Sequence, residues 1–224
     1  MKIDVKRDDL LQSLQSVIGV VERKQTMPIL ANVLINIKTD HYSVTATDLE
    51  VELISYVYSN NTEEFSFTAP GRKLLDICRA LPADSFVQIK SNDNKIQVLS
   101  GKSKFHLTTL PENEFPVIKD IQCNDEITIK QDRLKQIIDK THFSMAQQDV
   151  RYYLNGLLIE LESEKIRAVA TDGHRLALSS SKMEGDTENE RGNQVILPRK
   201  GVMEIHRPVS STHLALTPNP NVEI

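Results

Sequence analysis

The sequence predicts an α+β fold made of two tandem copies of one domain, and two observations carry this prediction. First, residues 46–48 (Ala-Thr-Asp) recur as residues 170–172, an interval of 124 residues. At this interval apolar positions fall on apolar positions from residue 2 to residue 55 without a gap, which is typical of duplicated domains of common size. Second, an order of strand, helix and three strands occurs twice within the first copy. Each domain is therefore predicted to contain two βαβββ halves, with two helices packed on one face of antiparallel sheet.

The first half-domain occupies residues 1–58. Residues 1–6 alternate apolar and polar side chains, which predicts a strand with one buried face. From Arg7 to Val21 apolar residues recur at helical spacing behind two aspartates, which suit the positive end of a helix dipole. Three further strands are predicted, at residues 29–37, 42–47 and 50–58.

The second half-domain repeats this order. A strand is predicted at residues 65–68 and an amphipathic helix at residues 72–81. Residues 111–123 contain two prolines and no periodicity, so we expect them to link the domains, which are assigned to residues 1–120 and 125–224. The three strands of this half are predicted at residues 86–90, 95–99 and 104–108.

The second copy follows the same plan but stops before it is complete. Residues 195–198 open its second half after a polar loop at residues 182–193. The last four residues match the strand at 95–98, and nothing corresponds to residues 104–115. We therefore expect the second domain to be incomplete at its C-terminus, with an unpaired strand edge and weak protection from residue 207 onward.

The composition is that of a folded chain, with 39% hydrophobic and 26% charged residues. No run of about 18 apolar residues and no charged-then-apolar leader is present, so neither a membrane span nor a signal peptide is expected. Cys78 and Cys123 follow no disulfide or metal-binding pattern, and we expect buried thiols in a reducing cytoplasm. The net charge of −4 argues mildly against a nucleic-acid partner, although it does not describe how charge is distributed.

Asp172, Gly173 and His174 invite a catalytic interpretation, in which a carboxylate orients a general base and the protein is a hydrolase. The alternative is turn chemistry, in which the aspartate accepts backbone hydrogen bonds and the glycine supplies a positive φ. The first copy keeps the aspartate, as Asp48, but lacks the histidine, which favours the structural role. There is no nucleophile elbow, histidine ligand spacing or glycine-rich phosphate loop, so no catalytic residue, metal site or cofactor is predicted.

Basic side chains lie opposite the apolar stripe of each predicted helix. They can be a solvated helix face, as most charged runs are. They can also line one continuous surface of equivalent helices that binds phosphates without reading sequence, with the acidic residues on the other side of the molecule. The residues concerned are Arg7, Arg72, Lys73, Arg79, Arg133, Lys135, Lys140, Arg199, Lys200 and Arg207.

Seven longer motifs mark the chain from residue 1 to about residue 205. They are MPIL at 27–30, ATDLE at 46–50, DICR at 76–79, FSMA at 143–146, DVRYYLNG at 149–156, ATDGHRL at 170–176 and LPRKG at 197–201. Together they resemble the bacterial DNA polymerase III beta subunit, the sliding clamp. The resemblance implies tandem clamp-type domains with helices lining a hole and sheets forming the outer wall. It also implies a non-catalytic processivity factor, which at full length has three domains and forms a head-to-tail homodimer ring around double-stranded DNA. The third domain is absent from this sequence.

The same resemblance assigns two sets of binding residues. The DNA contacts that the resemblance implies are Lys24, Arg72, Gln148, Tyr152 and Tyr153. For one of the two tyrosines, packing in a strand is the expected alternative. A pocket for short peptides of the DNA polymerase III catalytic subunit, the clamp loader and repair proteins is assigned to Leu154, Thr171, Gly173, His174, Arg175 and Leu176.

Three hypotheses for function follow. The leading one is a processivity factor that encircles duplex DNA and contacts it without sequence preference. The alternative is a repeat-built peptide-binding scaffold without DNA contact, in which the basic helix faces are only solvated. The third is a hydrolase that uses Asp172 and His174.

Overall fold

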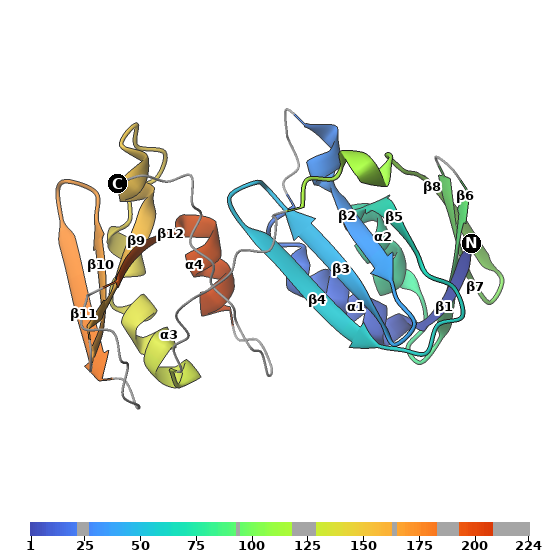
Figure 1. Ribbon diagram of the computed structural model, residues 1–224, viewed down its shortest axis with the longest axis horizontal. Coiled ribbons are helices and arrows are strands. Elements are labelled where there is room, and N and C mark those ends of the chain that lie inside the picture. The colour runs from blue at the N-terminus through green and yellow to red at the C-terminus, as the bar shows by residue number, and fades with distance from the viewer. Residues whose placement is uncertain (22–26, 93–94, 118–128, 163–164, 183–192, 208–224) are drawn as a thin grey trace. The chain divides into compact units, whose positions relative to one another are not determined.

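The chain divides into two compact units, Met1–Lys119 and Asp120–Ile224 (Figure 1). Both units combine helices with antiparallel sheet, so the predicted α+β class is confirmed. The computed structural model describes residues 1–21, 27–92, 95–117, 129–162, 165–182 and 193–207.

The elements of unit 1 follow the predicted order. They are β1 (Lys2–Lys6), α1 (Arg7–Val17), η1 (Pro28–Ala31), β2 (Asn32–Ile37), β3 (His41–Thr47), β4 (Glu52–Tyr58), β5 (Phe65–Pro70), α2 (Gly71–Ala80), β6 (Phe86–Asn92), β7 (Lys95–Ser100), β8 (Ser103–Thr108) and η2 (Glu112–Glu114). The strands form two antiparallel sheets, in the orders β4-β3-β2-β5 and β1-β6-β7-β8. The first strand of each half-domain therefore joins the sheet of the other half, β1 beside β6 and β5 beside β2.

One hydrophobic core joins both sheets and both helices of unit 1. Ile3 and Val5 of β1 are buried in it, which confirms the alternation predicted for the first strand. Leu14 of α1 and Leu74 of α2 are fully buried in the same core. Burial of such side chains stabilises a domain by about 1.5–3 kcal/mol each, so the helices are held mainly by this packing.

Two predicted elements differ at their ends. The helix predicted to reach Val21 ends at Val17, because Gly19, a poor helix former, follows closely. The strand predicted over residues 29–37 begins later, because Pro28 opens the 3-10 helix η1 in its place. Proline suits the first turn of a helix, where its missing N–H has no partner to lose.

Part of the predicted linker packs against unit 1. Phe115 is buried and joins Ile29 and Leu30 in a small apolar cluster. Leu110, the residue just before the predicted linker, is fixed as well, because Thr68 Oγ1 accepts a hydrogen bond from its backbone N–H at 3.1 Å and donates one to its carbonyl at 2.6 Å. The prediction that this segment is a linker is therefore wrong for its first residues.

Unit 2 repeats the first half of unit 1 at the predicted interval. Its elements are α3 (Gln131–Asp139), η3 (His142–Ser144), η4 (Tyr152–Asn155), β9 (Gly156–Glu162), β10 (Lys165–Thr171), β11 (Leu176–Lys182), β12 (Asn193–Pro198) and α4 (Arg199–His206). Both β10 and β11 begin and end 124 residues after β3 and β4. The sheet order is β11-β10-β9-β12, and α3 and α4 lie on one face of it (Figure 1). Ile137, Ile138 and Val202 attach the helices to the core.

One face of sheet β1-β6-β7-β8 is turned away from the core and is strongly basic. We call it the basic sheet face, and it carries Lys2, Asp4, Lys6, Lys90, Lys95 and Lys104. Five lysines against one aspartate give a charge of +4 on a chain whose net charge is −4. The expectation that acidic residues occupy the side opposite the helices is therefore wrong for this sheet.

Some predictions fall outside the described residues. These are Lys24, Cys123, most of the loop at 182–193, and the end of the second domain with its unpaired edge. Among the helices that the structure describes, none combines the length and apolar character needed to cross a membrane.

Candidate functional site

Asp172 organises a tight turn between β10 and β11. Its Oδ1 accepts hydrogen bonds from the backbone N–H groups of His174 and Arg175, both at 3.0 Å, and its Oδ2 accepts one from Arg175 Nε at 3.0 Å. These bonds, first of all that from the His174 amide, lower the pKa of Asp172. The carboxylate serves the turn rather than an imidazole, so the geometry gives the hydrolase hypothesis no support.

The first copy contains the same turn between β3 and β4. Asp48 Oδ1 accepts hydrogen bonds from the amides of Glu50 at 3.1 Å and Val51 at 2.9 Å. The backbone is left-handed in both turns, with φ of +80° at Leu49 and +86° at Gly173. The two copies thus share one turn geometry, although only the second has the residue type that adopts it without strain. This agreement supports the structural role of the aspartate.

The second turn lies beside η3. Arg175 Nη2 donates a hydrogen bond of 2.8 Å to the carbonyl of Phe143, and its guanidinium carbon lies 5.8 Å from the centre of the Phe143 ring. The N–H of Ala146, two residues after η3, donates to the carbonyl of Leu154 in η4 at 3.0 Å. Segments 143–146, 151–154 and 171–176 therefore meet in unit 2, and they bring the predicted pocket residues together around one turn.

The predicted pocket residues differ in exposure. Leu154 is only 8% exposed, whereas Leu176 at the start of β11 is 64% exposed. Thr171 is half-buried, and its hydroxyl donates to the Arg175 carbonyl at 2.7 Å. Gly173, His174 and Arg175 are exposed. An apolar side chain standing free next to polar groups of a rigid turn is a suitable anchor for a peptide.

A braced loop leads into η4. Asp149 accepts hydrogen bonds from Arg151 Nε and Nη2, both at 3.0 Å, and this contact lowers the pKa of Asp149 to about 2. Asn155 accepts from the Asp149 amide at 2.9 Å and donates to the Asp149 carbonyl at 2.9 Å. The loop is thus held by side chain-to-backbone bonds at both ends.

Three of the predicted DNA contacts lie on this loop and on η4. Gln148 has a positive φ of +59°. Tyr152 and Tyr153 are 63% and 50% exposed, and their rings meet edge to face at 6.0 Å. The expectation that one tyrosine packs in a strand is wrong, because both belong to the 3-10 helix η4 and face solvent.

Sequence reasoning missed the roles of Phe143 and Arg151. Arg151 Nη2 lies 3.2 Å from the point where a Cβ of Gly173 would stand, so this side chain packs against the turn. The ion pair of Asp149 with Arg151 could have been found from the sequence, because the two opposite charges are only two residues apart. The contact of Phe143 with Arg175 joins residues 32 positions apart, so no local sequence pattern predicts it.

Arg72 begins α2 and is exposed. Its Nη2 donates a hydrogen bond of 2.6 Å to the carbonyl of Val21, the last described residue before the segment that contains Lys24. The other basic residues of α2 and α3 are also exposed, as predicted for a phosphate-binding or solvated face. They are Lys73, Arg79, Arg133 and Lys135, and Lys140, which directly follows α3, is exposed as well.

Arg7 does not belong to that basic face. Its side chain is 13% exposed, and its Nε donates to the carbonyl of Cys78 at 2.7 Å while Nη2 donates to that of Arg79 at 3.3 Å. The guanidinium thus caps the C-terminal end of α2, where carbonyls lack helical partners. The prediction of Arg7 as a surface cation is wrong.

Arg199, another of the predicted basic residues, is half-buried and donates to the Met145 carbonyl at 3.4 Å.

Fold and site together define a class of protein before any relative is considered. The protein is a tandem-repeat α+β binding module, with exposed basic residues on a helix of each unit and a rigid turn that presents Leu176. Across the described ranges, no group of acidic, histidine or cysteine side chains is arranged to hold a metal ion.

Two domain models of one protein family match the chain. The family described as DNA polymerase III beta subunit, N-terminal domain, matches residues 1–119, and its central domain matches residues 128–219. The chain belongs to the DNA polymerase III beta subunit family, which confirms the predicted resemblance.

Individual members of this family are similar to the chain in sequence and in structure. The beta sliding clamp of Pseudomonas putida is 47% identical over 208 residues, which are 92% of this chain and 56% of that protein. The crystal structure of the DNA polymerase III subunit beta from Pseudomonas aeruginosa superposes with a TM-score of 0.86 at 45% identity, over 92% of this chain and 56% of that one. A sliding clamp from the same organism, bound to griselimycin, gives a TM-score of 0.84 at 46% identity and the same coverage. The chain spans a little over half the length of these relatives.

Proposed function

We propose that the chain forms the first domain and most of the central domain of a DNA polymerase processivity factor. In full-length form this sliding clamp encircles double-stranded DNA as a head-to-tail homodimer ring in the cytoplasm. It tethers the DNA polymerase III catalytic subunit, the clamp loader and repair proteins through short peptides, and it catalyses no reaction. Family membership at this level of identity is the observation that carries the proposal.

The exposed basic residues of α2 and α3 support the DNA-facing role. They lie on exposed helix surfaces, although Arg79 also forms an ion pair with Asp76 at 3.8 Å, and the exposed residues of these helices include no aromatic ring that would stack on bases. Contact with DNA is therefore electrostatic and independent of sequence. Arg72 donates a hydrogen bond to the carbonyl of Val21, and Lys24 follows three residues later in the sequence. Tyr152 and Tyr153 are exposed, so their hydroxyl groups can hydrogen-bond to a DNA backbone.

A salt series tests this role against the peptide-only scaffold. Arg72→Ala should weaken binding equally on duplexes of different sequence and lower the slope of log affinity against log salt by about one unit. Lys182→Ala, an exposed lysine on the sheet of unit 2, is the matched control and should leave the slope unchanged. A marked preference among duplexes, or equal effects of both substitutions, would refute the proposed interface.

The turn with Leu176 supports the peptide-binding role. Leu176→Asp places an unpaired carboxylate where a peptide side chain should bury apolar surface, so affinity should fall by about 100-fold or more. Leu178→Asp is the matched control, because Leu178 is 57% exposed on the same strand two residues away. Calorimetry with a polymerase-derived peptide and the full-length protein measures both. If the two substitutions act alike, the pocket lies elsewhere.

A further inference from the structure

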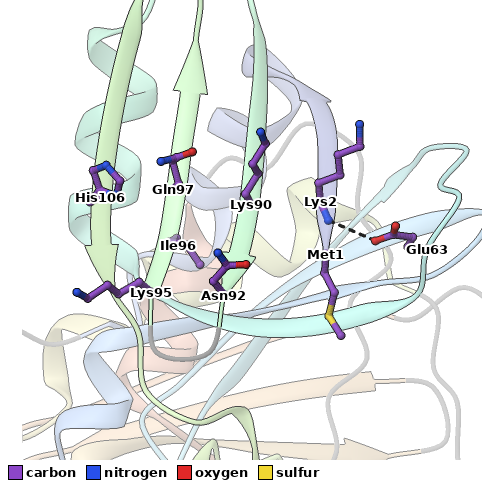
Figure 2. A pocket seen from close by; sticks show the side chains of 9 residues that line it. All are labelled: Met1, Lys2, Glu63, Lys90, Asn92, Lys95, Ile96, Gln97 and His106. Carbon is purple, nitrogen blue, oxygen red and sulfur yellow. Dashed lines mark hydrogen bonds between the residues drawn. The ribbon is translucent and has the colours of Figure 1, made fainter.

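The basic sheet face contains a row of polar side chains that crosses all four strands. Lys2 lies directly opposite Lys90, which lies opposite Gln97, which lies opposite His106. Figure 2 shows these four side chains beside one another on adjacent strands. Like charges directly opposite each other on a sheet are destabilising, so the fold carries a cost in the pairing of Lys2 with Lys90.

A cavity of about 470 Å³ opens along this row, within the range of small-ligand sites. Lys95 and Asn92 contribute to its lining next to the row (Figure 2). Glu63 stands at its edge, where its carboxylate accepts a hydrogen bond of 3.3 Å from the backbone N–H of Lys2. The cavity therefore offers several cationic and amide donors to one ligand and has a single carboxylate in its lining.

The charge of the face is not neutralised by the parts of the chain that the structure describes. Asp4, the one acidic residue on the face, accepts a hydrogen bond of 2.8 Å from Gln88 Nε2. Within the described ranges none of the five lysines of the face forms an ion pair with a carboxylate. Asp93, between β6 and β7 in the sequence, lies outside the described residues. Unpaired cations gathered on one face attract polyanions.

An aromatic ring stands among these cations. Phe86 is 63% exposed and lies directly opposite Lys6 on the neighbouring strand. His106 is a second exposed ring on the same face. An exposed phenylalanine on a sheet costs free energy in water, whereas a stacked nucleobase covers it. The helix faces of α2 and α3 have no such rings, so the two basic surfaces differ in chemistry.

We propose that the basic sheet face binds single-stranded nucleic acid. Lys2, Lys90 and Lys95 contact the phosphates, Phe86 stacks on a base, and Gln97 hydrogen-bonds base edges or sugar. Antiparallel sheets with exposed rings bind single strands in this way, because unpaired bases can turn toward the protein. A duplex hides its base faces and would leave Phe86 without a partner. An acidic peptide would satisfy the lysines but not the ring. The surface is separate from the helix face of the proposed function, and neither depends on the other.

Fluorescence anisotropy tests the proposal, with a labelled oligothymidylate of about 16 nucleotides and the whole chain across a salt series. The double substitution Lys2→Gln with Lys90→Gln should weaken binding and lower the salt slope by up to about 1.4, or 0.7 for each lost phosphate contact. Phe86→Ala should weaken binding about fivefold or more, as expected for loss of one stacking ring. Circular dichroism of each variant confirms folding.

Lys165→Gln with Lys182→Gln is the matched control, because these exposed lysines also face each other across two antiparallel strands. Equal weakening by the control pair would mean that any surface charge suffices, and it would overturn the proposal. Polyglutamate at equal charge should not displace the oligonucleotide. If it does, and Phe86→Ala binds like the wild type, the face is a docking site for acidic peptides and the assignment is wrong. The salt series on duplex DNA with Arg72→Ala measures the contribution of the helix face separately.

Discussion

The turns at Leu49 and Gly173 allow one prediction to be worked out in detail, because they share a geometry and differ in residue type. Gly173→Ala places a Cβ at φ +86°, in the left-handed region that costs an L-residue about 1–2 kcal/mol. Lower entropy of the unfolded chain offsets about 0.4–1 kcal/mol of this. The new Cβ would also lie 3.2 Å from Arg151 Nη2, which must shift slightly while it holds Asp149. The net expected loss is about 1 kcal/mol of the unfolding free energy of unit 2.

Leu49→Gly is the reciprocal change in the first copy. It relieves about 1–2 kcal/mol of left-handed strain. Against this, the unfolded chain gains freedom worth about 0.5–1 kcal/mol, and a leucine that is 49% exposed loses roughly 1 kcal/mol of its partial burial. The expected net change is therefore close to zero, although glycine normally destabilises a folded protein.

The chain contains no tryptophan, so urea unfolding is best followed by hydrogen exchange with mass spectrometry, which separates the two units. Gly173→Ala should shift the midpoint of unit 2 alone. It should also weaken peptide binding, because the same turn carries His174 and Arg175. A loss below about 0.3 kcal/mol in unit 2, or a loss above about 1.5 kcal/mol for Leu49→Gly, would refute the reasoning about backbone strain.

Three further predictions concern single side chains. Arg7→Ala should lower the stability of unit 1 by about 1–3 kcal/mol in urea unfolding, because the end of α2 loses a charged donor, and it should leave the salt slope of DNA binding unchanged. The pKa of Asp149 is lowered from 3.8 to about 2, so its stabilising effect is present above pH 4 and is lost as pH falls toward 2. Acid unfolding of Asp149→Asn should therefore show a weaker pH dependence in this window. Burial raises the pKa of Cys78 to about 12, so a thiol reagent at pH 8 should not modify it in folded Cys123→Ser protein and should do so after unfolding.

Much of the fold could be predicted because it follows from repeated and periodic patterns in the sequence. The interval of 124 residues between Asp48 and Asp172 predicts the bounds of β10 and β11 from those of β3 and β4. Alternation in β1 and helical spacing in α2 are equally local, since both follow from which side chains the core buries. The turn role of Asp172 was predictable for the same reason, because its hydrogen bonds reach only three residues ahead.

What could not be predicted depends on contacts between distant residues. Arg7 occupies the first turn of α1, and only the packed structure reveals that the end of α2 lies beside it, 71 residues later. The gathering of lysines on the basic sheet face depends on the pairing of β1 with β6, which no local periodicity specifies. Phe86 likewise looks like a core residue until its neighbours in the sheet are known.

The exchange of first strands between the halves of unit 1 has a consequence for how such a domain can arise and come apart. Neither half closes its own sheet, because β1 completes the sheet of β6, β7 and β8 while β5 completes that of β2, β3 and β4. An isolated half would lack the strand that the other half contributes and half of the shared core, and exchange of first strands with a second copy of itself would restore both. Two separate βαβββ halves would therefore complete each other's sheets only as a dimer that depends on concentration, whereas in one chain the same association is intramolecular. Mechanical or thermal release of β1 alone should accordingly loosen the second half of the domain before the first.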